Sequence, residues 1–410
     1  MDNKELKKNS KVLLFSVFIV LILGIFGLIM FHQLKHGDFP IHIAWAKEYS
    51  ENGYLYKMAH PFFAKLVTVV RALLPANLLT WISPLAKQVY DLKAFEISAL
   101  IVSSLAYLAT GLIMLKRVIR DWNIKKETGL YFAGLAVLII MLLGPIFIFT
   151  FSERMYSGYL SANRYDSPTY ILLRPFALLI FFGIVDNFTE KWNWKESLLM
   201  VLVMMCATLT KPTFTMTIIP AIGLLTLLRI KQFRKINWAY LFFPFALTAF
   251  IVLVGQFIIN YTGDRGDRII LAPFQAILYI VPNIHTVFFL VLMSLVFPLA
   301  VSLLNWKQVK NDFTFQLGWV NLFLGLIVAL MFGEEINMGL NNLWNSPTLG
   351  AFILFFITVA WWGKDLLDSR QAQKKITKKQ IVTSTLLLLH FICGIIYYVA
   401  ILINIGVNVG

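Results

Sequence analysis

Long runs of apolar residues, separated by short polar segments, restrict the fold of this chain more than any other feature of its sequence. A helix needs about 20 apolar residues to cross the hydrocarbon core of a membrane, and irregular backbone cannot face lipid. The runs are therefore predicted to be spanning helices. We count about eleven, over residues 12–31, 95–115, 130–150, 170–185, 197–210, 213–228, 238–260, 284–304, 313–332, 348–362 and 381–402. The fifth and sixth are separated only by Lys211 and Pro212, which leaves a tight hairpin and one broken helix as alternatives.

Composition excludes a soluble protein. Hydrophobic residues make up 59% of the 410 residues and charged residues only 14%, so a water-soluble fold would expose far more apolar surface than such proteins tolerate. We therefore predict an all-α, polytopic membrane protein in which residues 1–410 form a single transmembrane domain. The first run lacks a small-residue cleavage site and is expected to be retained. Cys206 and Cys393 fall inside runs, where two buried thiols are favoured over a disulfide.

Basic residues predict the orientation of the bundle. With the N-terminus in the cytoplasm, the cytoplasmic segments hold 23 of the 36 Lys and Arg residues, although they contain less loop sequence. The positive-inside rule then places the C-terminus outside the plasma membrane. Four segments are expected on the outer side: 32–94, 151–170, 260–283 and 333–347. The net charge of +15 lies mostly in short loops, so contact with anionic lipids of the bilayer is predicted rather than nucleic-acid binding.

The first of these outer segments begins with an acid at the membrane surface. Asp38 lies just beyond the first apolar run, where a carboxylate reaches both an aqueous substrate and a lipid head group. His42, Trp45, Ala46 and Tyr49 then follow at the spacing of one helix face. The pattern predicts a short helix along the membrane surface, with Asp38 before its start and a glycine, residue 53, as its stop. A second surface helix is expected over residues 61–74, which are too short to span and contain two basic residues.

This stretch resembles the first outer loop of a known enzyme class. The resemblance rests on Asp38, His42, the sequence Gly-Tyr-Leu-Tyr at 53–56 and His60-Pro61, and it covers about thirty residues, 37–66. The class is the GT-C membrane glycosyltransferases, which include protein O-mannosyltransferases and lipid A aminoarabinose transferases. The resemblance implies that Asp38 is the catalytic base and that the sugar donor is a polyprenyl phosphate or diphosphate.

One residue departs from the pattern of that class. Many relatives have Asp-Glu at this point, whereas Phe39 follows Asp38 here, so a second adjacent carboxylate is missing. Some members bind a divalent cation, which makes Mg²⁺ or Mn²⁺ a conceivable cofactor. We assign no metal ligands, because His42 and His60 lack a second clear carboxylate beside them, and we favour orienting or phosphate-contacting roles for both.

The departing carrier phosphate requires positive charge. Arg174, about one turn inside the fourth run, would be costly facing lipid and is expected to face a polar cavity or a phosphate. The Asp-Arg pairs at 264–265 and 267–268 are either solvated surface charges or a clasp for a diphosphate. The candidate phosphate-binding residues are Arg154, Arg164, Arg174, Lys211, Arg265 and Arg268.

A short motif recurs at three predicted helix starts on the outer side. Asp-Ser-Pro-Thr at 166–169 returns as Asn-Ser-Pro-Thr at 345–348, and Lys-Pro-Thr at 211–213 is a shortened form. These residues are good helix caps and need be nothing more. If the starts converge, however, their free N–H groups suit a phosphate. Residues 269–283, apolar and interrupted by two prolines, are a candidate re-entrant or interfacial piece that covers a lipid donor.

Aromatic and amide side chains of the outer loops are candidates for substrate binding. Trp344 is equally explained as a sugar platform and as a membrane anchor. The complete set is His42, Trp45, Tyr49, Tyr56, His60, Asp166, Trp344 and Asn345.

These features predict an inverting glycosyltransferase that moves a sugar from a polyprenyl-linked donor to an extracytoplasmic glycan, cell-wall polymer or lipid. A single displacement, with Asp38 removing the proton of the acceptor hydroxyl, inverts the anomeric centre. No P-loop, dinucleotide-binding or zincin motif is present. The alternatives are a polymerase or ligase of lipid-linked oligosaccharides and a lipid or solute transporter, which would place charges at mid-membrane. A non-catalytic scaffold would leave the Asp38 segment unexplained.

Overall fold

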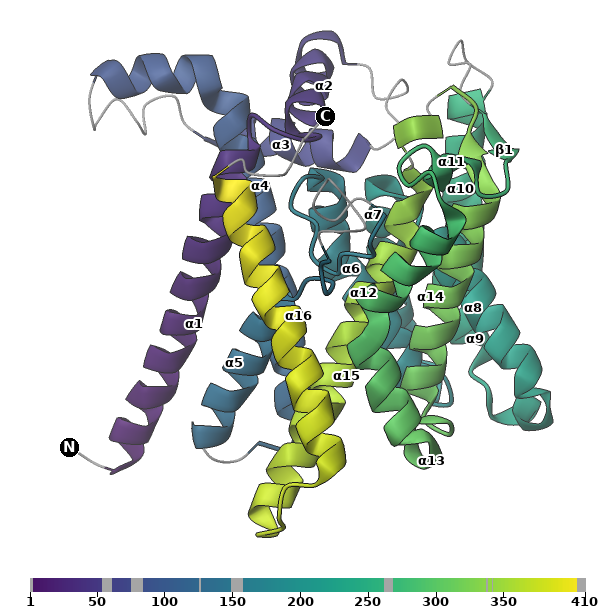
Figure 1. Ribbon diagram of the computed structural model, residues 1–410. Helices are drawn as coiled ribbons and strands as arrows, with labels where there is room; N and C mark the ends of the chain where they lie inside the picture. Colours follow the sequence, from purple (N-terminus) through teal and green to yellow (C-terminus); the bar gives the residue numbers. More distant parts are fainter. Residues whose placement is uncertain are drawn as a thin grey trace.

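Helices make up almost all of the structure, as the apolar runs predict (Figure 1). The computed structural model describes residues 3–53, 61–74, 84–124, 127–148, 158–261, 268–336, 338–340 and 342–403. Within these residues the exception is a two-stranded sheet, in which β1 (Ile269–Leu271) pairs antiparallel with β2 (Phe332–Glu334). The prediction of an all-α chain is confirmed apart from this small sheet.

The helices follow one another with short connections. In chain order they are α1 (Asn3–Gln33), α2 (Phe39–Asn52), α3 (Pro61–Leu73), α4 (Pro84–Asp121), α5 (Glu127–Leu142), α6 (Pro168–Asn187), α7 (Trp194–Thr210), α8 (Thr215–Leu228), the 3-10 turn η1 (Ile230–Lys235), α9 (Trp238–Leu241), the π-helical turn η2 (Phe242–Leu247), α10 (Thr248–Tyr261), α11 (Gln275–Leu278), α12 (Ile284–Leu304), α13 (Trp306–Val309), α14 (Phe313–Met331), the 3-10 turns η3 (Met338–Leu340) and η4 (Asn342–Trp344), α15 (Asn345–Gln371) and α16 (Lys378–Leu402).

Eight helical stretches of the described residues are long and apolar enough to cross a membrane, so the chain is a multi-pass membrane protein. They are Val12–Gln33, Ala94–Asp121, Pro168–Asn187, Trp238–Gly255, Ile284–Leu304, Phe313–Met331, Asn342–Gln371 and Lys378–Leu402. The predicted count of eleven is not reached, because α5, α7 and α8 have only 16, 17 and 14 residues. Helix α5 ends where Gly144 and Pro145 follow, and a proline disfavours helical backbone before it.

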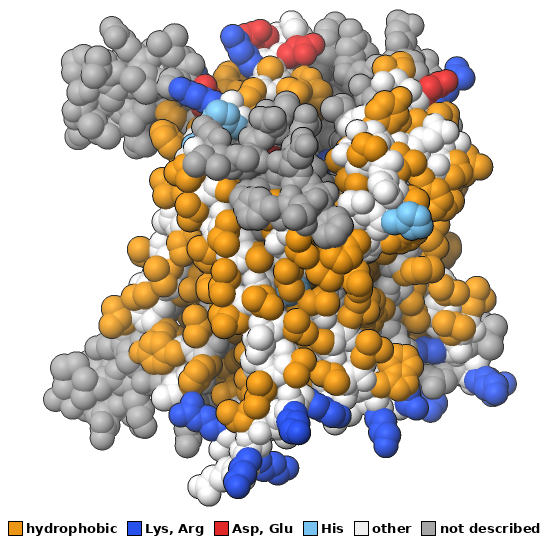
Figure 2. Space-filling model, in the orientation of Figure 1, with side chains coloured by type: hydrophobic (Ala, Val, Ile, Leu, Met, Phe, Trp, Pro, Cys, Tyr) orange, Lys and Arg blue, Asp and Glu red, His pale blue; other side chains and the backbone are white. Residues whose placement is uncertain are grey.

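The bundle has two chemically different ends. Helix α1 begins at one end and α16 finishes at the other, where α2, α3 and the sheet also lie (Figure 1). We call the end with α2 and α3 the Asp38 end and the other the opposite end. Figure 2 shows a middle band of apolar side chains, Lys and Arg along the rim of the opposite end, and charges of both signs at the Asp38 end. This banding is what a membrane-spanning bundle requires.

Helix α2 forms where the sequence predicts a surface helix. Pro40 occupies its first turn, where a missing N–H costs nothing. Gly53 ends it in the left-handed conformation, with φ of 70°, and donates its N–H to the Tyr49 carbonyl. Its inner face buries His42 and Ala46, and the Thr68 hydroxyl of α3 donates to the Ala46 carbonyl at 3.1 Å. The predicted start, stop and face of this helix are therefore confirmed, and α3 confirms the second helix.

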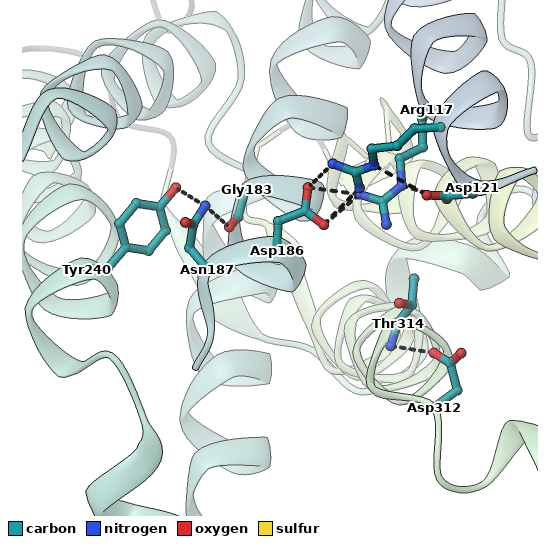
Figure 3. Close-up of polar contacts among 9 residues, drawn as sticks. Arg117, Asp121, Gly183, Asp186, Asn187, Tyr240, Asp312 and Thr314 are labelled. Atoms are coloured by element: carbon teal, nitrogen blue, oxygen red, sulfur yellow. Dashed lines mark hydrogen bonds and ion pairs between the residues drawn. The ribbon is translucent and has the colours of Figure 1, made fainter. Parts of the chain in front are cut away.

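Helices α4 and α6 are joined at the opposite end by a charged cluster (Figure 3). The Arg117 guanidinium donates to Asp121 at 2.7 Å and to both oxygens of Asp186 at 2.9 and 3.1 Å. Arg120 also donates to Asp186, at 2.7 and 2.9 Å. Charge-assisted bonds of this kind fix one geometry. The cluster therefore sets the register of α6, whose start carries residues of the candidate site at the Asp38 end.

Candidate functional site

The candidate site begins with the turn that connects α1 to α2. Gly37 has φ of 59°, in the left-handed region, and a Cβ on it would lie only 2.7 Å from the carbonyl oxygen of Asp166. The next residue, Asp38, donates its backbone N–H to that same oxygen at 3.0 Å. Only glycine allows this close approach without strain. The turn thus holds Asp38 against Asp166, which lies far away in the sequence.

The Asp38 carboxylate is not used to cap the helix that follows it. Asp38 is the N-cap residue of α2, yet its side chain accepts no capping hydrogen bond, and its backbone is in the right-handed helical region. The residue is partly exposed. In the described part of the chain it joins no ion pair either. A purely structural role as a helix cap is therefore not supported. Within the described residues the carboxylate is engaged neither as a cap nor in an ion pair.

Asp166 pairs with an arginine and an amide from two other segments. The Arg164 Nε donates to Asp166 at 3.0 Å, a second guanidinium nitrogen binds the other carboxylate oxygen, and Nη1 donates to the Asn345 side-chain oxygen at 2.9 Å. Burial would raise the pKa of Asp166, but the Arg164 charge outweighs burial and holds that pKa below its usual value. Both side chains are therefore charged at neutral pH.

Lys211 is the second cation of the site. It lies between α7 and α8, which are two separate helices, and its side chain is 2% exposed. Burial lowers its pKa to about 8. The negative charge of Asp38 is the strongest influence that opposes this shift, with smaller contributions from Asp166 and Glu334, whereas Arg164 adds to the lowering. Lys211 thus lies within electrostatic reach of all three acids.

The three repeated motifs meet at this end. The Ser346 hydroxyl donates to the Thr213 carbonyl at 3.2 Å, which joins the start of α15 to the start of α8. The bond from Arg164 to Asn345 joins the α6 entry to α15. Ser167 makes no capping hydrogen bond, and the buried Thr213 hydroxyl has no partner among the described residues. The starts of α6, α8 and α15 therefore converge, a point that the sequence left open, and capping alone does not account for it.

His42 belongs to the packing beneath Asp38. It is 5% exposed, and its ring contacts Trp45 and Phe63 edge to face at centroid distances of 4.8 and 5.8 Å. Burial, and next the charge of Lys211, lower the pKa of His42 to about 3, so its imidazole is neutral at pH 7. A neutral ring cannot neutralise a phosphate, which leaves the orienting role. Trp45 and Tyr49 are partly buried on the same helix.

Trp344 lies in the interior rather than at the interface. It is 6% exposed, and its indole N–H donates to the Tyr159 carbonyl at 3.0 Å. The ring is therefore presented neither as a sugar platform nor as a membrane anchor, and it instead holds the segment that leads to Arg164. Arg174 is fully buried and does not face an open cavity as expected. Of the remaining candidates, Arg268 is exposed beside β1, and Tyr56, His60, Arg154 and Arg265 lie outside the described residues.

Glu334 is the site residue that sequence reasoning missed. It ends β2, lies opposite Ile269, and accepts a hydrogen bond from Asn342 at 2.9 Å. It directly follows an apolar run, as Asp38 does, and that position was the available signal. The sequence lacks a second carboxylate next to Asp38. The structure brings one, that of Glu334, into the electrostatic surroundings of Lys211 from a distant part of the chain.

The segment over 269–283 is neither a plain loop nor a re-entrant helix. It forms β1 and the short helix α11, and its backbone binds the end of α14 through Ala272 and Phe274, which donate to the Met331 and Leu330 carbonyls. The described residues contain no group of three His, Cys, Asp or Glu side chains arranged to hold a metal ion.

No protein-family model matches this chain, and no curated protein is significantly similar to it.

Proposed function

We propose that this chain is an inverting glycosyltransferase of the GT-C type, which moves a sugar from a polyprenyl phosphate or diphosphate to an extracytoplasmic glycan, cell-wall polymer or lipid. The observation that carries the proposal is the Asp38 carboxylate. It is partly exposed, does not cap α2, and shares an electrostatic cluster with Lys211 and Arg164 at one end of an apolar bundle.

Asp38 acts as the general base. Its carboxylate takes the proton of the acceptor hydroxyl while the hydroxyl oxygen attacks the anomeric carbon. The bond between that carbon and the phosphate oxygen breaks, and the polyprenyl phosphate leaves with both bonding electrons. One displacement from the opposite face inverts the anomeric centre.

Lys211 meets the charge of the leaving phosphate. Arg164 is already engaged by Asp166 and Asn345, so Lys211 is the cation of the described site with no ion pair of its own. A buried ammonium interacts with a phosphate far more strongly than one in water. The converging starts of α6, α8 and α15 add backbone N–H groups, whose partial positive charge also favours a phosphate.

The charge distribution supports placing the Asp38 end outside the plasma membrane. Lys and Arg line the opposite end, where α1 begins, and the positive-inside rule assigns such an end to the cytoplasm (Figure 2). In this orientation α2 and α3 lie along the outer interface within a long first loop. Helices α5, α7 and α8 are short, but they can also cross if they stand nearly upright and the bilayer thins around them, which brings the total to eleven spans.

The test is lipid and glycan analysis of cells that carry Asp38→Asn, with Glu48→Gln on the exposed face of α2 as the matched control. Loss of a general base costs about 10²–10⁴-fold in rate, so the first variant should accumulate a polyprenyl-linked sugar while it inserts normally. The control should behave like the wild type. Unchanged glycan products in Asp38→Asn would refute the assignment. A wild-type product of several repeating units would instead identify a polymerase or ligase.

A further inference from the structure

Arg174 lies beneath the site in an unusual environment. It belongs to the first turns of α6 and is the largest of the fully buried side chains among the described residues. Its guanidinium carbon lies 4.9, 5.2 and 5.3 Å from the ring centroids of Tyr170, Phe352 and Tyr107, which come from three helices. Contacts with aromatic faces stabilise a cation that is removed from water.

This arginine is poorly compensated as a structural residue. No carboxylate of the described residues pairs with it, and its Nε and Nη1 make no hydrogen bond there. A buried charge without a counterion is costly, and an apolar residue of similar volume is often as stable or more so. Ionisable residues inside spanning helices are for this reason usually functional. Stability alone therefore does not explain Arg174.

The hydrogen bond that its guanidinium makes to the backbone leads directly to the site. Nη2 of Arg174 donates to the backbone carbonyl of Arg164 at 3.0 Å. Arg164 in turn binds Asp166, and the carbonyl of Asp166 accepts the N–H of Asp38. Three contacts thus connect a fixed charge inside α6 to the backbone of the proposed base.

We propose that Arg174 is a positioning residue, which holds the backbone at Arg164 so that the Arg164–Asp166 pair and Asp38 keep their arrangement around Lys211. The proposal rests on the proposed glycosyl transfer. Direct contact between Arg174 and a donor phosphate is not supported, because its guanidinium is packed among three aromatic rings. Arg174 acts through the segment above it instead.

The test compares Arg174→Met with a control that has the same chemistry at the opposite end. Arg229 also stacks on aromatic rings, with its guanidinium carbon 4.7 Å from the Phe313 ring centroid and 6.0 Å from that of Phe188, and it donates to the Gln316 side chain. Arg229→Met is therefore the matched control. Three quantities are measured on detergent-purified full-length protein: the Tm, amide hydrogen exchange over residues 158–168, and the kcat/KM of sugar transfer.

We expect Arg174→Met to keep or raise the Tm, to speed exchange over 158–168 by about tenfold, and to lower kcat/KM by about 100-fold, the scale of a displaced catalytic group. Arg174→Lys, which keeps the positive charge and a nitrogen that can donate to the Arg164 carbonyl, should restore part of the activity. Arg229→Met should change neither the exchange over 158–168 nor kcat/KM.

A lower Tm in Arg174→Met, with exchange and kcat/KM unchanged, would show that Arg174 is only structural and would overturn the proposal. The exchange measurement needs no substrate. If the wild type transfers no sugar but Arg174→Met still loosens 158–168, the proposed function fails while the positioning role stands. If transfer depends on Asp38 but not on Arg174, the positioning role fails alone.

Discussion

At the scale of single residues, the site depends on a contact between two turns that lie far apart in the sequence. Gly37 lets the backbone reach the Asp166 carbonyl, and that contact orients Asp38. The carboxylate is left unpaired and Lys211 is left without a salt bridge in the described structure, although each lies within the field of the other. Such mutually unsatisfied charges are typical of sites that await a ligand.

Gly37→Ala tests this contact. The new Cβ would meet the Asp166 carbonyl at 2.7 Å in a backbone conformation that alanine disfavours, so we expect a loss of about 2–3 kcal/mol in stability and of most activity. Gly53→Ala is the control, because Gly53 has φ of 70° but no atom within 4 Å of the added Cβ. It should cost only about 1 kcal/mol and leave activity intact. Equal effects of the two substitutions on activity would argue against the Gly37 contact.

The lowered pKa of Lys211 predicts that activity and stability change in opposite directions as the pH rises. Its pKa of about 8 means that it loses its proton above pH 8 in the folded protein, whereas in the unfolded chain it keeps the proton up to about 10.5. If Lys211 holds the donor phosphate as proposed, donor binding needs the charged form, and the donor KM should rise by about tenfold per pH unit above 8. The unfolded state binds more protons in that window, so this residue adds stability as pH rises from 8 toward 10.5.

Lys211→Arg stays charged and should flatten the rise in KM. Lys211→Met should abolish the stability gain when unfolding is compared at pH 7 and 9.5. A donor KM that stays constant from pH 7 to 9.5 in the wild type would contradict the role of Lys211.

At the scale of elements, local signals predicted well and distant contacts did not. Proline in the first turn and glycine at the stop determine α2, so its bounds followed from the sequence. The end of α5 was misplaced, because apolar residues continue past Gly144 while the backbone does not remain helical. Glu334 was missed because its approach to Lys211 depends on how β2 pairs with β1, and no periodicity reports that pairing. Trp344 was misjudged because burial by other segments overrides its usual place at interfaces.

The charged cluster between α4 and α6 gives the prediction at this scale. Asp186→Asn replaces the carboxylate that accepts hydrogen bonds from Arg117 and Arg120 with a neutral amide. The Arg117 side chain is only 12% exposed, so its charge would be left poorly compensated. We expect a loss of about 1–3 kcal/mol in stability, measured as a lower Tm in detergent. Glu51→Gln is the control. Its pair with Lys47 is 3.9 Å long and mostly exposed, so the change should stay within about 0.5 kcal/mol. Equal changes in Tm would mean that the cluster does not join the helices.

At the scale of the whole molecule, every part of the proposed chemistry lies at one end of the bundle. The starts of α6, α8 and α15, the turn before α2 and the strand β2 all contribute there, while the opposite end carries Lys and Arg and the cluster of Figure 3. A polyprenyl carrier presents its phosphate at one leaflet surface. The side on which the Asp38 end lies therefore decides which donors it can meet.

Single cysteines at the two ends measure that side. In a chain with Cys206→Ala and Cys393→Ala, Glu48→Cys places a thiol on the exposed face of α2, and Lys375→Cys places one in the exposed connection between α15 and α16. A membrane-impermeant maleimide added to intact cells should label the first and not the second, and both should react after permeabilisation. The reverse pattern would put Asp38 in the cytoplasm, in conflict with the positive-inside rule. It would also remove outward-facing lipid-linked sugars from the possible donors, because their phosphates lie at the other surface.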